Sequence, residues 1–289
     1  MSPHQFFLGH PAFHVTLAAT IVASMVAFFS DATILLFIIV FGQVHFLLAY
    51  FYANKSGKIN RSYGIRFFWV FLLAAVLAIL VFRNAGYFPW LILVTGAIFT
   101  AHYTTDEIHL FSLQNVLHRV VGVLGMTLTW SAVFVERLFA QTVFLTVLLS
   151  VFGVSLILFF LWRNRRVLTR SFRGGFFAVW YILHGLFSVS AALVFDTLSI
   201  NQILGFIVLT HYVHWYLFST IRYGGSELSF YVDTILWGHA LAFLMFVLYA
   251  LAPHSGVLFL FFHPAFFYGW TIVHILMTFR SNDLIKQTL

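Results

Sequence analysis

Three side chains that can bind a metal recur at helical spacing in the stretch from Ala101 to Leu110. His102, Asp106 and His109 stand at positions i, i+4 and i+7, so they share one face if the preceding apolar helix continues through them. Two imidazoles and a carboxylate on one face, at the end of a membrane span, form half of a metal site. The alternative is an interfacial helix end whose polar side chains face water.

The composition indicates a membrane protein. Hydrophobic residues make up 62% of the chain and charged residues 8%, and the mean hydropathy is +0.98. A soluble domain cannot bury so much apolar surface, so we expect an all-α, polytopic membrane protein that forms one transmembrane domain over residues 1–289. The absence of Cys excludes disulfides, thiolate metal sites and cysteine-bound iron–sulfur clusters.

Hydropathy predicts about ten transmembrane helices. Their expected ranges are 12–29, 33–53, 66–82, 87–103, 119–135, 140–162, 175–195, 200–221, 230–252 and 257–279. Alternation through these spans places every Lys and Arg except Arg83 and Arg137 on the side of the two termini. By the positive-inside rule, both termini are predicted to be cytoplasmic. The net charge of +7 is spread over short loops, which indicates topology signals rather than binding of nucleic acid.

The fourteen histidines test this topology, because they were not used to draw it. His254 and His263 fall at the outer end, and His4, His10 and His14 lie near the N-terminus. The remaining nine all fall in the cytoplasmic half of a span or in the adjoining loop. Buried ionisable side chains in membranes are costly and usually have a function. Scattered hydrogen bonds between helices would not avoid the outer leaflet, so we expect one histidine layer that holds metal.

The candidate metal ligands are the histidines of this layer and the nearest carboxylate. They are His45, His102, Asp106, His109, His118, His184, His211, His214, His239 and His274. The pair His211 and His214 has i, i+3 spacing, and Asp233 could accept an imidazole N–H from a neighbouring span. No catalytic residue is assigned beyond these ligands.

A nitrogen-rich ligand set near a membrane face is typical of a dinuclear non-haem iron centre that uses O₂. In this respect the chain resembles the membrane histidine-cluster oxygenases, the fatty-acid desaturases and alkyl hydroxylases. Those enzymes have an HxxxH box and two HxxHH boxes. No HxxHH box is present here, and His211-x-x-His214 is followed by Trp215 where a second histidine would stand. His184-Gly185-Leu186 is likewise a poor match to the motif of the membrane-bound bacterial β-carotene-cleaving dioxygenases. No residue role is therefore carried over, and no family is assigned.

The predicted function is oxidation of a lipid or isoprenoid by hydroxylation, desaturation or double-bond cleavage. A soluble cytoplasmic electron donor would be steered to the arginines between Arg163 and Arg173. The alternatives are a protein that transfers electrons through haem b, a zinc site, and a transporter with a histidine relay. Few ionisable groups fall in the outer half, which disfavours both a haem stack across the membrane and a transport path.

Overall fold

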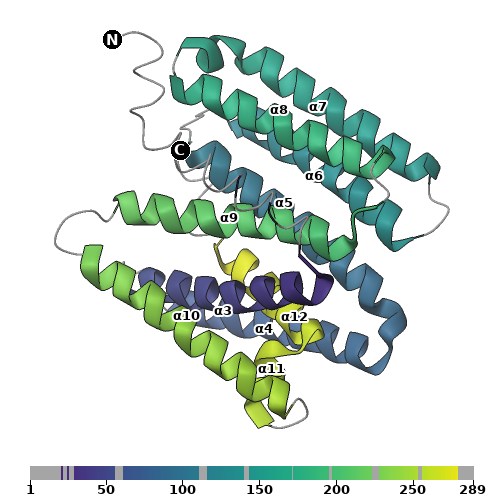
Figure 1. The fold of residues 1–289 in the computed structure, drawn as a ribbon. Coiled ribbons are helices and arrows are strands. Elements are labelled where there is room, and N and C mark those ends of the chain that lie inside the picture. The colour runs from purple at the N-terminus through teal and green to yellow at the C-terminus, as the bar shows by residue number, and fades with distance from the viewer. Residues whose placement is uncertain are drawn as a thin grey trace. The chain divides into compact units, whose positions relative to one another are not determined.

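The computed structural model describes residues 21, 25, 29–55, 61–110, 116–139, 143–170, 172–194, 197–222, 228–252 and 256–278 (Figure 1). Within these ranges the elements are all helices, without a strand, which confirms the all-α prediction. The described residues form two compact units. Unit 1 takes its residues from Met1–Tyr87 and Asn201–Met277, and unit 2 from Phe88–Ile200 and Thr278–Leu289. The units are described separately below.

Unit 1 is built from two segments that are far apart in the sequence. Its elements are α3 (Asp31–Lys55), α4 (Arg61–Arg83), the 3₁₀ turn η2 (Ala85–Tyr87), α9 (Ile200–Arg222, from Asn201 on), α10 (Leu228–Leu251), α11 (Gly256–Phe262) and α12 (Pro264–Thr278). Helix α3 begins at a Ser30 cap, whose hydroxyl accepts a hydrogen bond from the Thr33 N–H at 3.3 Å. Helix α10 packs along α3.

Helix α12 packs on α4 in unit 1. Ala74 of α4 forms a buried apolar cluster with Val273 and Met277 of α12. The Arg66 guanidinium donates a hydrogen bond to the carbonyl of Leu276. Together these contacts fix the end of α12 that carries His274.

The tenth predicted span, 257–279, is interrupted at His263. Helices α11 and α12 meet there at 64°. Pro264 has no N–H to donate and disfavours a helical conformation at the residue before it, so a new helix begins at Pro264. His263 caps this helix, because its Nδ1 accepts a hydrogen bond from the Ala265 N–H at 3.3 Å.

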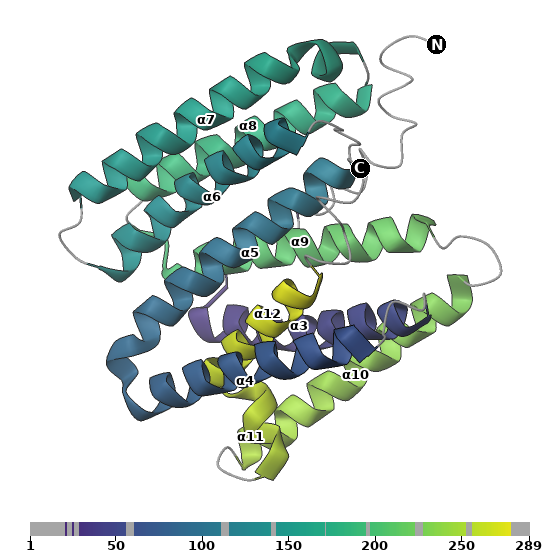
Figure 2. The ribbon, with the colours of Figure 1, turned by 180° about the vertical axis from the view of Figure 1, so that it is seen from behind.

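The described residues of unit 2 form a bundle of four long helices (Figure 2). They are α5 (Phe88–Leu110), α6 (Val116–Leu138), α7 (Val143–Arg170) and α8 (Phe172–Leu193), and α6 packs against the other three. Two glycines let α6 and α7 approach closely. A Cβ built on Gly125 would lie 3.1 Å from the Gly153 carbonyl oxygen, and one on Gly153 would lie 2.9 Å from the Thr129 nitrogen. This close packing between small residues is typical of helices in membranes.

Six helices in the described part of the chain are long and apolar enough to cross a membrane, or seven if α11 and α12 form one broken span. This supports a multi-pass membrane protein. In the most apolar stretch of each helix, only 17% of α4 and 6% of α10 is buried. Both helices therefore have large apolar surfaces that suit contact with lipid. Most of the first predicted span, 12–29, lies outside the described residues. The count of ten spans, the cytoplasmic termini and the single domain stay predictions.

Candidate metal centre

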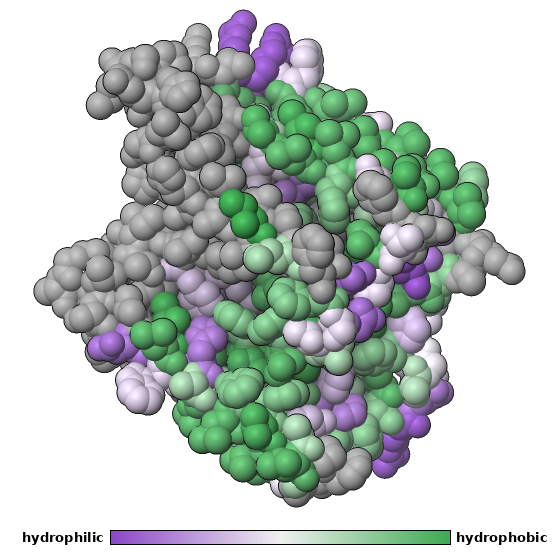
Figure 3. All heavy atoms as spheres, viewed as in Figure 1, coloured by the Kyte–Doolittle hydropathy of each residue, from purple (hydrophilic) through white to green (hydrophobic). Residues whose placement is uncertain are grey.

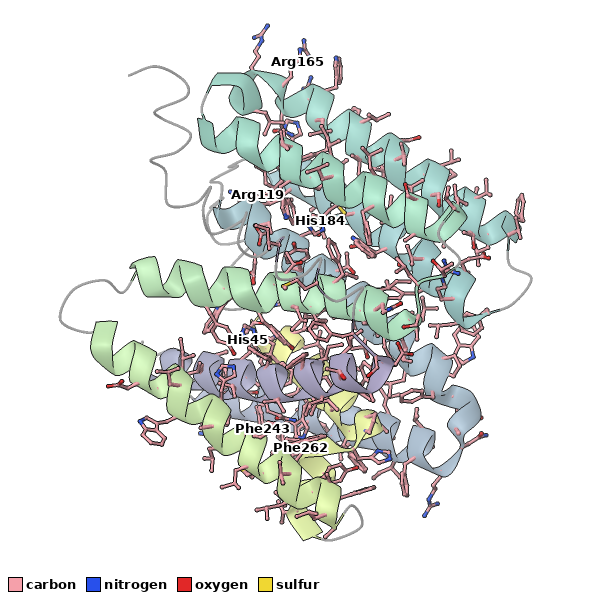
Figure 4. The ribbon with its side chains drawn as sticks, in the orientation of Figure 1. His45, Arg119, Arg165, His184, Phe243 and Phe262 are labelled. Carbon is pink, nitrogen blue, oxygen red and sulfur yellow. The ribbon has the colours of Figure 1, made fainter. Side chains whose placement is uncertain are left out.

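Three buried histidines from three helices meet in unit 1. His45 of α3, which Figure 4 labels, has ring contacts with His211 of α9 and His274 of α12, and each of the three is only 2–3% exposed. The ring centroids of His45 and His211 are 5.3 Å apart, and those of His45 and His274 are 4.8 Å apart. Two imidazoles that share a tetrahedral ion, at about 2.0 Å from each nitrogen, have ring centroids roughly 5 Å apart. Each pair has the centroid spacing of two imidazoles on one ion, which is also the spacing of rings that only pack together.

Aromatic side chains enclose this histidine group. The ring centroids of Tyr212 and Trp215 lie 4.9 and 4.7 Å from that of His45. Phe46 stacks on His274, with a centroid distance of 4.7 Å and an angle of 26°. Gly42, three residues before His45, makes this packing possible, because a Cβ there would come within 2.9 Å of the Tyr212 hydroxyl. The result is a buried, largely aromatic enclosure around His45.

His239 lies on α10 of the same unit, beyond the ring of Tyr216. Its Nδ1 donates to the Ile235 carbonyl at 2.7 Å, which leaves Nε2 with a lone pair. The ring centroid of Tyr216 lies 5.3 Å from that of His239 and 6.3 Å from that of His45. The Tyr216 hydroxyl is held by the Phe41 carbonyl at 3.2 Å. His239 therefore offers a further imidazole nitrogen on the far side of Tyr216.

Among the described residues of unit 1, the candidate metal ligands next to His45 are the imidazole nitrogens of His211 and His274. The acids in the described part of unit 1 are Asp31 and Asp233, and both are exposed. The predicted role of Asp233, as acceptor of an imidazole N–H from a neighbouring span, stays a prediction. A metal bound by the histidine group of unit 1 would be coordinated by imidazole, with water or substrate in any open position.

Unit 2 holds the stretch from which the sequence argument began. Helix α5 runs through Leu110, as the spacing predicts, and His102 Nε2 lies 3.4 Å from Asp106 Oδ2 one turn later. His102 is 3% and Asp106 23% exposed. Carboxylates at this position commonly orient metal-binding imidazoles and make them more basic. Glu107, the next residue, is also buried, at 3% exposed.

His184 of α8 lies against a tyrosine and a tryptophan in unit 2 (Figure 4). Its Nε2 is 3.5 Å from the Tyr103 hydroxyl, a distance at the long limit of a hydrogen bond. The Trp180 ring packs at 4.6 Å between centroids. Tyr103 is completely buried, so this pair is shielded from water.

Protein groups occupy both ring nitrogens of His118 on α6. Nδ1 lies 3.2 Å from Asn164 Oδ1, and Nε2 accepts a hydrogen bond from Arg163 Nε at 3.4 Å. Asn164 donates its own amide hydrogen to the Phe160 carbonyl, so its Oδ1 must be the acceptor of the Nδ1 proton. This arrangement favours a structural role that joins α6 to α7.

The structure thus divides the predicted ligands between the two units. His45, His211, His239 and His274 are in unit 1, and His102, Asp106, His118 and His184 are in unit 2. The side chains of His109 and His214 lie outside the described residues, as do the side chains of His4, His10, His14 and His254. The prediction that the nine histidines among the candidate ligands form one layer has not been tested.

Sequence reasoning missed the partners of several histidines. Tyr212 and Trp215 follow His211 by one and four residues, so the local signal was an aromatic side chain near a histidine in the same helix. In a chain that is 20% aromatic this signal is too common to select them. Asn164, which holds His118, carries no local signal because it lies on another helix.

Comparison with known proteins found no match to this chain among protein family models, curated proteins or solved structures.

Proposed function

We propose that the chain is a membrane-embedded metalloenzyme that holds non-haem iron through histidines and oxidises a lipid or isoprenoid with O₂. The observation that carries this proposal is the buried group formed by His45, His211 and His274 on three helices. Imidazole suits iron, and a buried enclosure of aromatic side chains limits the access of water to a reactive metal. Bound iron would supply the activation of O₂, and the side chains would position the ion and exclude water.

The crowding around His45 favours a single ion or a pair of ions over haem. A porphyrin bound through His45 must insert its wide, flat ring beside the imidazole. Four other rings already lie between 4.7 and 5.3 Å from that of His45, those of His211, Tyr212, Trp215 and His274. Haem binding would have to displace this packing, and an ion would not.

The carboxylate–imidazole pair of unit 2 gives the proposal its second part. His102 and Asp106 have the arrangement of a metal ligand with its supporting carboxylate. We therefore include His102 among the proposed ligands and Asp106 among the residues that orient them. His118 is placed last, because its ring nitrogens already have protein partners.

Metal analysis of matched variants tests the proposal. The protein would be purified in detergent without chelator and measured by plasma mass spectrometry and absorption spectroscopy. Replacing His45 with Gln should lower the iron content most, because this ring contacts both other histidines, and H211Q and H274Q should follow. Loss of an orienting partner alone costs about 10–100-fold in metal affinity, and loss of a ligand should cost at least as much.

The control variant is H118Q, which should keep its iron. Rings that merely pack together have similar spacings, so a wild-type protein without bound metal would refute the proposal. A Soret band that disappears in H45Q would assign the histidines to haem. Iron that is lost in H118Q and kept in H45Q would put the centre elsewhere in the chain.

A further inference from the structure

Three arginines surround one hollow near the end of α7. Arg163, Arg165 and Arg166 line a cavity of about 250 Å³, and all three are exposed. Figure 4 shows Arg165 projecting outward from the bundle at this end of α7. The sequence contains no Asp or Glu between Arg137 and Phe195, so the charged residues of α7 and α8 are all basic. The hollow is therefore suited to an anion.

An apolar surface adjoins the arginines on the same helix. Leu158, Phe159 and Trp162 are 60%, 45% and 55% exposed. The Arg165 guanidinium carbon lies 5.2 Å from the centroid of the Trp162 ring, and its Nη1 donates to the Trp162 carbonyl at 3.0 Å. In the space-filling view, hydrophilic side chains stand beside a hydrophobic surface at this end of the molecule (Figure 3). An exposed tryptophan between apolar and basic residues is typical of a membrane–water interface.

A hydrogen bond to α6 holds Arg163 in place. Arg163 Nε donates to His118 Nε2 at 3.4 Å, and His118 is in turn 3.2 Å from Asn164, which is buried. A side chain that is already oriented loses less conformational entropy when it binds a ligand. The apolar span Val143–Arg166 ends at this group, so the arginines lie where lipid headgroups are found.

We propose that this arginine hollow binds the phosphate headgroup of an anionic membrane lipid, whose acyl chains lie along Leu158, Phe159 and Trp162. Guanidinium groups bind phosphate oxygens through paired, charge-assisted hydrogen bonds. A soluble acidic protein would use the arginines alone and would leave the adjoining apolar surface without a role. The lipid accounts for both surfaces, and it does not depend on the proposed oxidation.

Lipid binding to the full-length protein in detergent tests this inference. Native mass spectrometry would compare phosphatidylglycerol, which is anionic, with phosphatidylcholine, which is zwitterionic. A basic residue near an anionic surface contributes about 1 kcal/mol, or about fivefold in affinity. R163Q, R165Q and R166Q should each weaken phosphatidylglycerol binding by about fivefold, and the triple variant by on the order of 10²-fold. The control is R83Q, which removes an exposed arginine from the end of α4 and should change nothing.

Two further measurements identify the source of the phosphate and the occupant. W162A should lower the affinity for phosphatidylglycerol but leave the affinity for inorganic phosphate unchanged, because only the lipid has acyl chains. If W162A changed the affinities for phosphatidylglycerol and for inorganic phosphate by the same factor, the site would be one for free phosphate. Displacement of lipid by a polyglutamate peptide at lower concentrations than by inorganic phosphate would show an acidic-protein surface. Equal binding of the two lipids, or full binding by the three single variants with unchanged melting temperatures, would overturn the proposal.

Discussion

The histidines of this chain differ in the hydrogen bonds that their ring nitrogens make. His118 uses both nitrogens on protein partners, and His239 donates one to its own helix and keeps the other as an acceptor. His263 uses Nδ1 to cap a helix. Counting histidines in a membrane sequence therefore overestimates a ligand set, because some of them satisfy the backbone or join helices.

Replacement of His263 by alanine should destabilise the protein without removing metal. The Ala265 N–H at the start of α12 would lose its acceptor, and loss of a helix cap costs about 0.5–2 kcal/mol. H263N should keep most of the stability, because Asn is a favoured capping residue. Unfolding in a mixed detergent, followed by circular dichroism, would compare both variants with the wild type. Equal stability of H263A and the wild type would show that the cap has no energetic role.

Local spacing predicted those residue contacts that lie within one helix. His102 and Asp106 are four residues apart, so a helical period alone places them together, as the structure confirms. His118 and Asn164 come from α6 and α7, and their contact depends on how these helices pack. A single sequence contains no direct signal for such a pair, and this is why His118 remained among the predicted ligands.

At the scale of elements, glycine fixes the distance between α6 and α7. The backbones approach at Gly125 and Gly153, where a methyl group on either residue would meet the opposite helix. Because neighbouring helices in lipid gain little from the hydrophobic effect, this packing must contribute much of their association. The same pair of helices carries His118 and Asn164, so the glycines also set the geometry of that contact.

Replacement of Gly153 by alanine should destabilise unit 2. Its new Cβ would lie 2.6 Å from Thr129 Cγ2 and 2.9 Å from the Thr129 nitrogen, so α6 and α7 would have to separate. Overpacking of this kind costs about 1–3 kcal/mol. The matched control is G64A on α4, where a Cβ meets nothing within 4 Å, and alanine there should be neutral or stabilise by up to about 1 kcal/mol. Thermal unfolding in one detergent would compare them, and a loss in G64A as large as in G153A would contradict the packing argument.

Hydropathy predicted most helices but not their interruption. The expected ranges 66–82 and 119–135 lie within α4 and α6, because a long apolar run in a membrane must satisfy its own backbone hydrogen bonds. The range 257–279 is equally apolar, yet it breaks at Pro264. Proline is tolerated inside some membrane helices, so Pro264 alone does not predict a break; here the His263 side chain caps the helix that begins at Pro264.

At the scale of the whole molecule, the exposed apolar surfaces and the basic residues indicate how the chain lies in a membrane. The large exposed apolar surfaces of α4 and α10 suit lipid contact on more than one part of the chain. Basic residues lie at the ends of apolar helices. Arg61 and Arg83 bound α4, and Arg166 ends the apolar span of α7. The number of spans decides which of these ends share a side of the membrane.

Reporter fusions at four positions should establish the topology. Fusions after Arg61 and Arg170 are expected to be cytoplasmic, because these sites lie on the side with most basic residues. Fusions after Ser199 and Pro253 are expected to be external. Paired alkaline phosphatase and fluorescent protein fusions would give opposite signals at each site. A cytoplasmic signal at both Ser199 and Pro253 would rule out ten alternating spans and, with them, the single histidine layer.

The reaction itself should leave an oxygen-dependent trace in membrane lipids. A substrate dissolved in the bilayer could enter between helices and bring its reactive carbon to the histidine group of unit 1 while its chain stays in hydrocarbon. We expect lipid extracts from cells that express the protein with O₂ to contain a hydroxylated, desaturated or cleaved lipid or isoprenoid. The product should be missing without O₂ and strongly reduced in H45Q, while H118Q should retain it. Mass spectrometry would compare the extracts at equal protein levels. If the wild-type protein produced no oxygen-dependent change while it held iron, the histidine centre would have a role other than lipid oxidation, and electron transfer or transport would be the next functions to test.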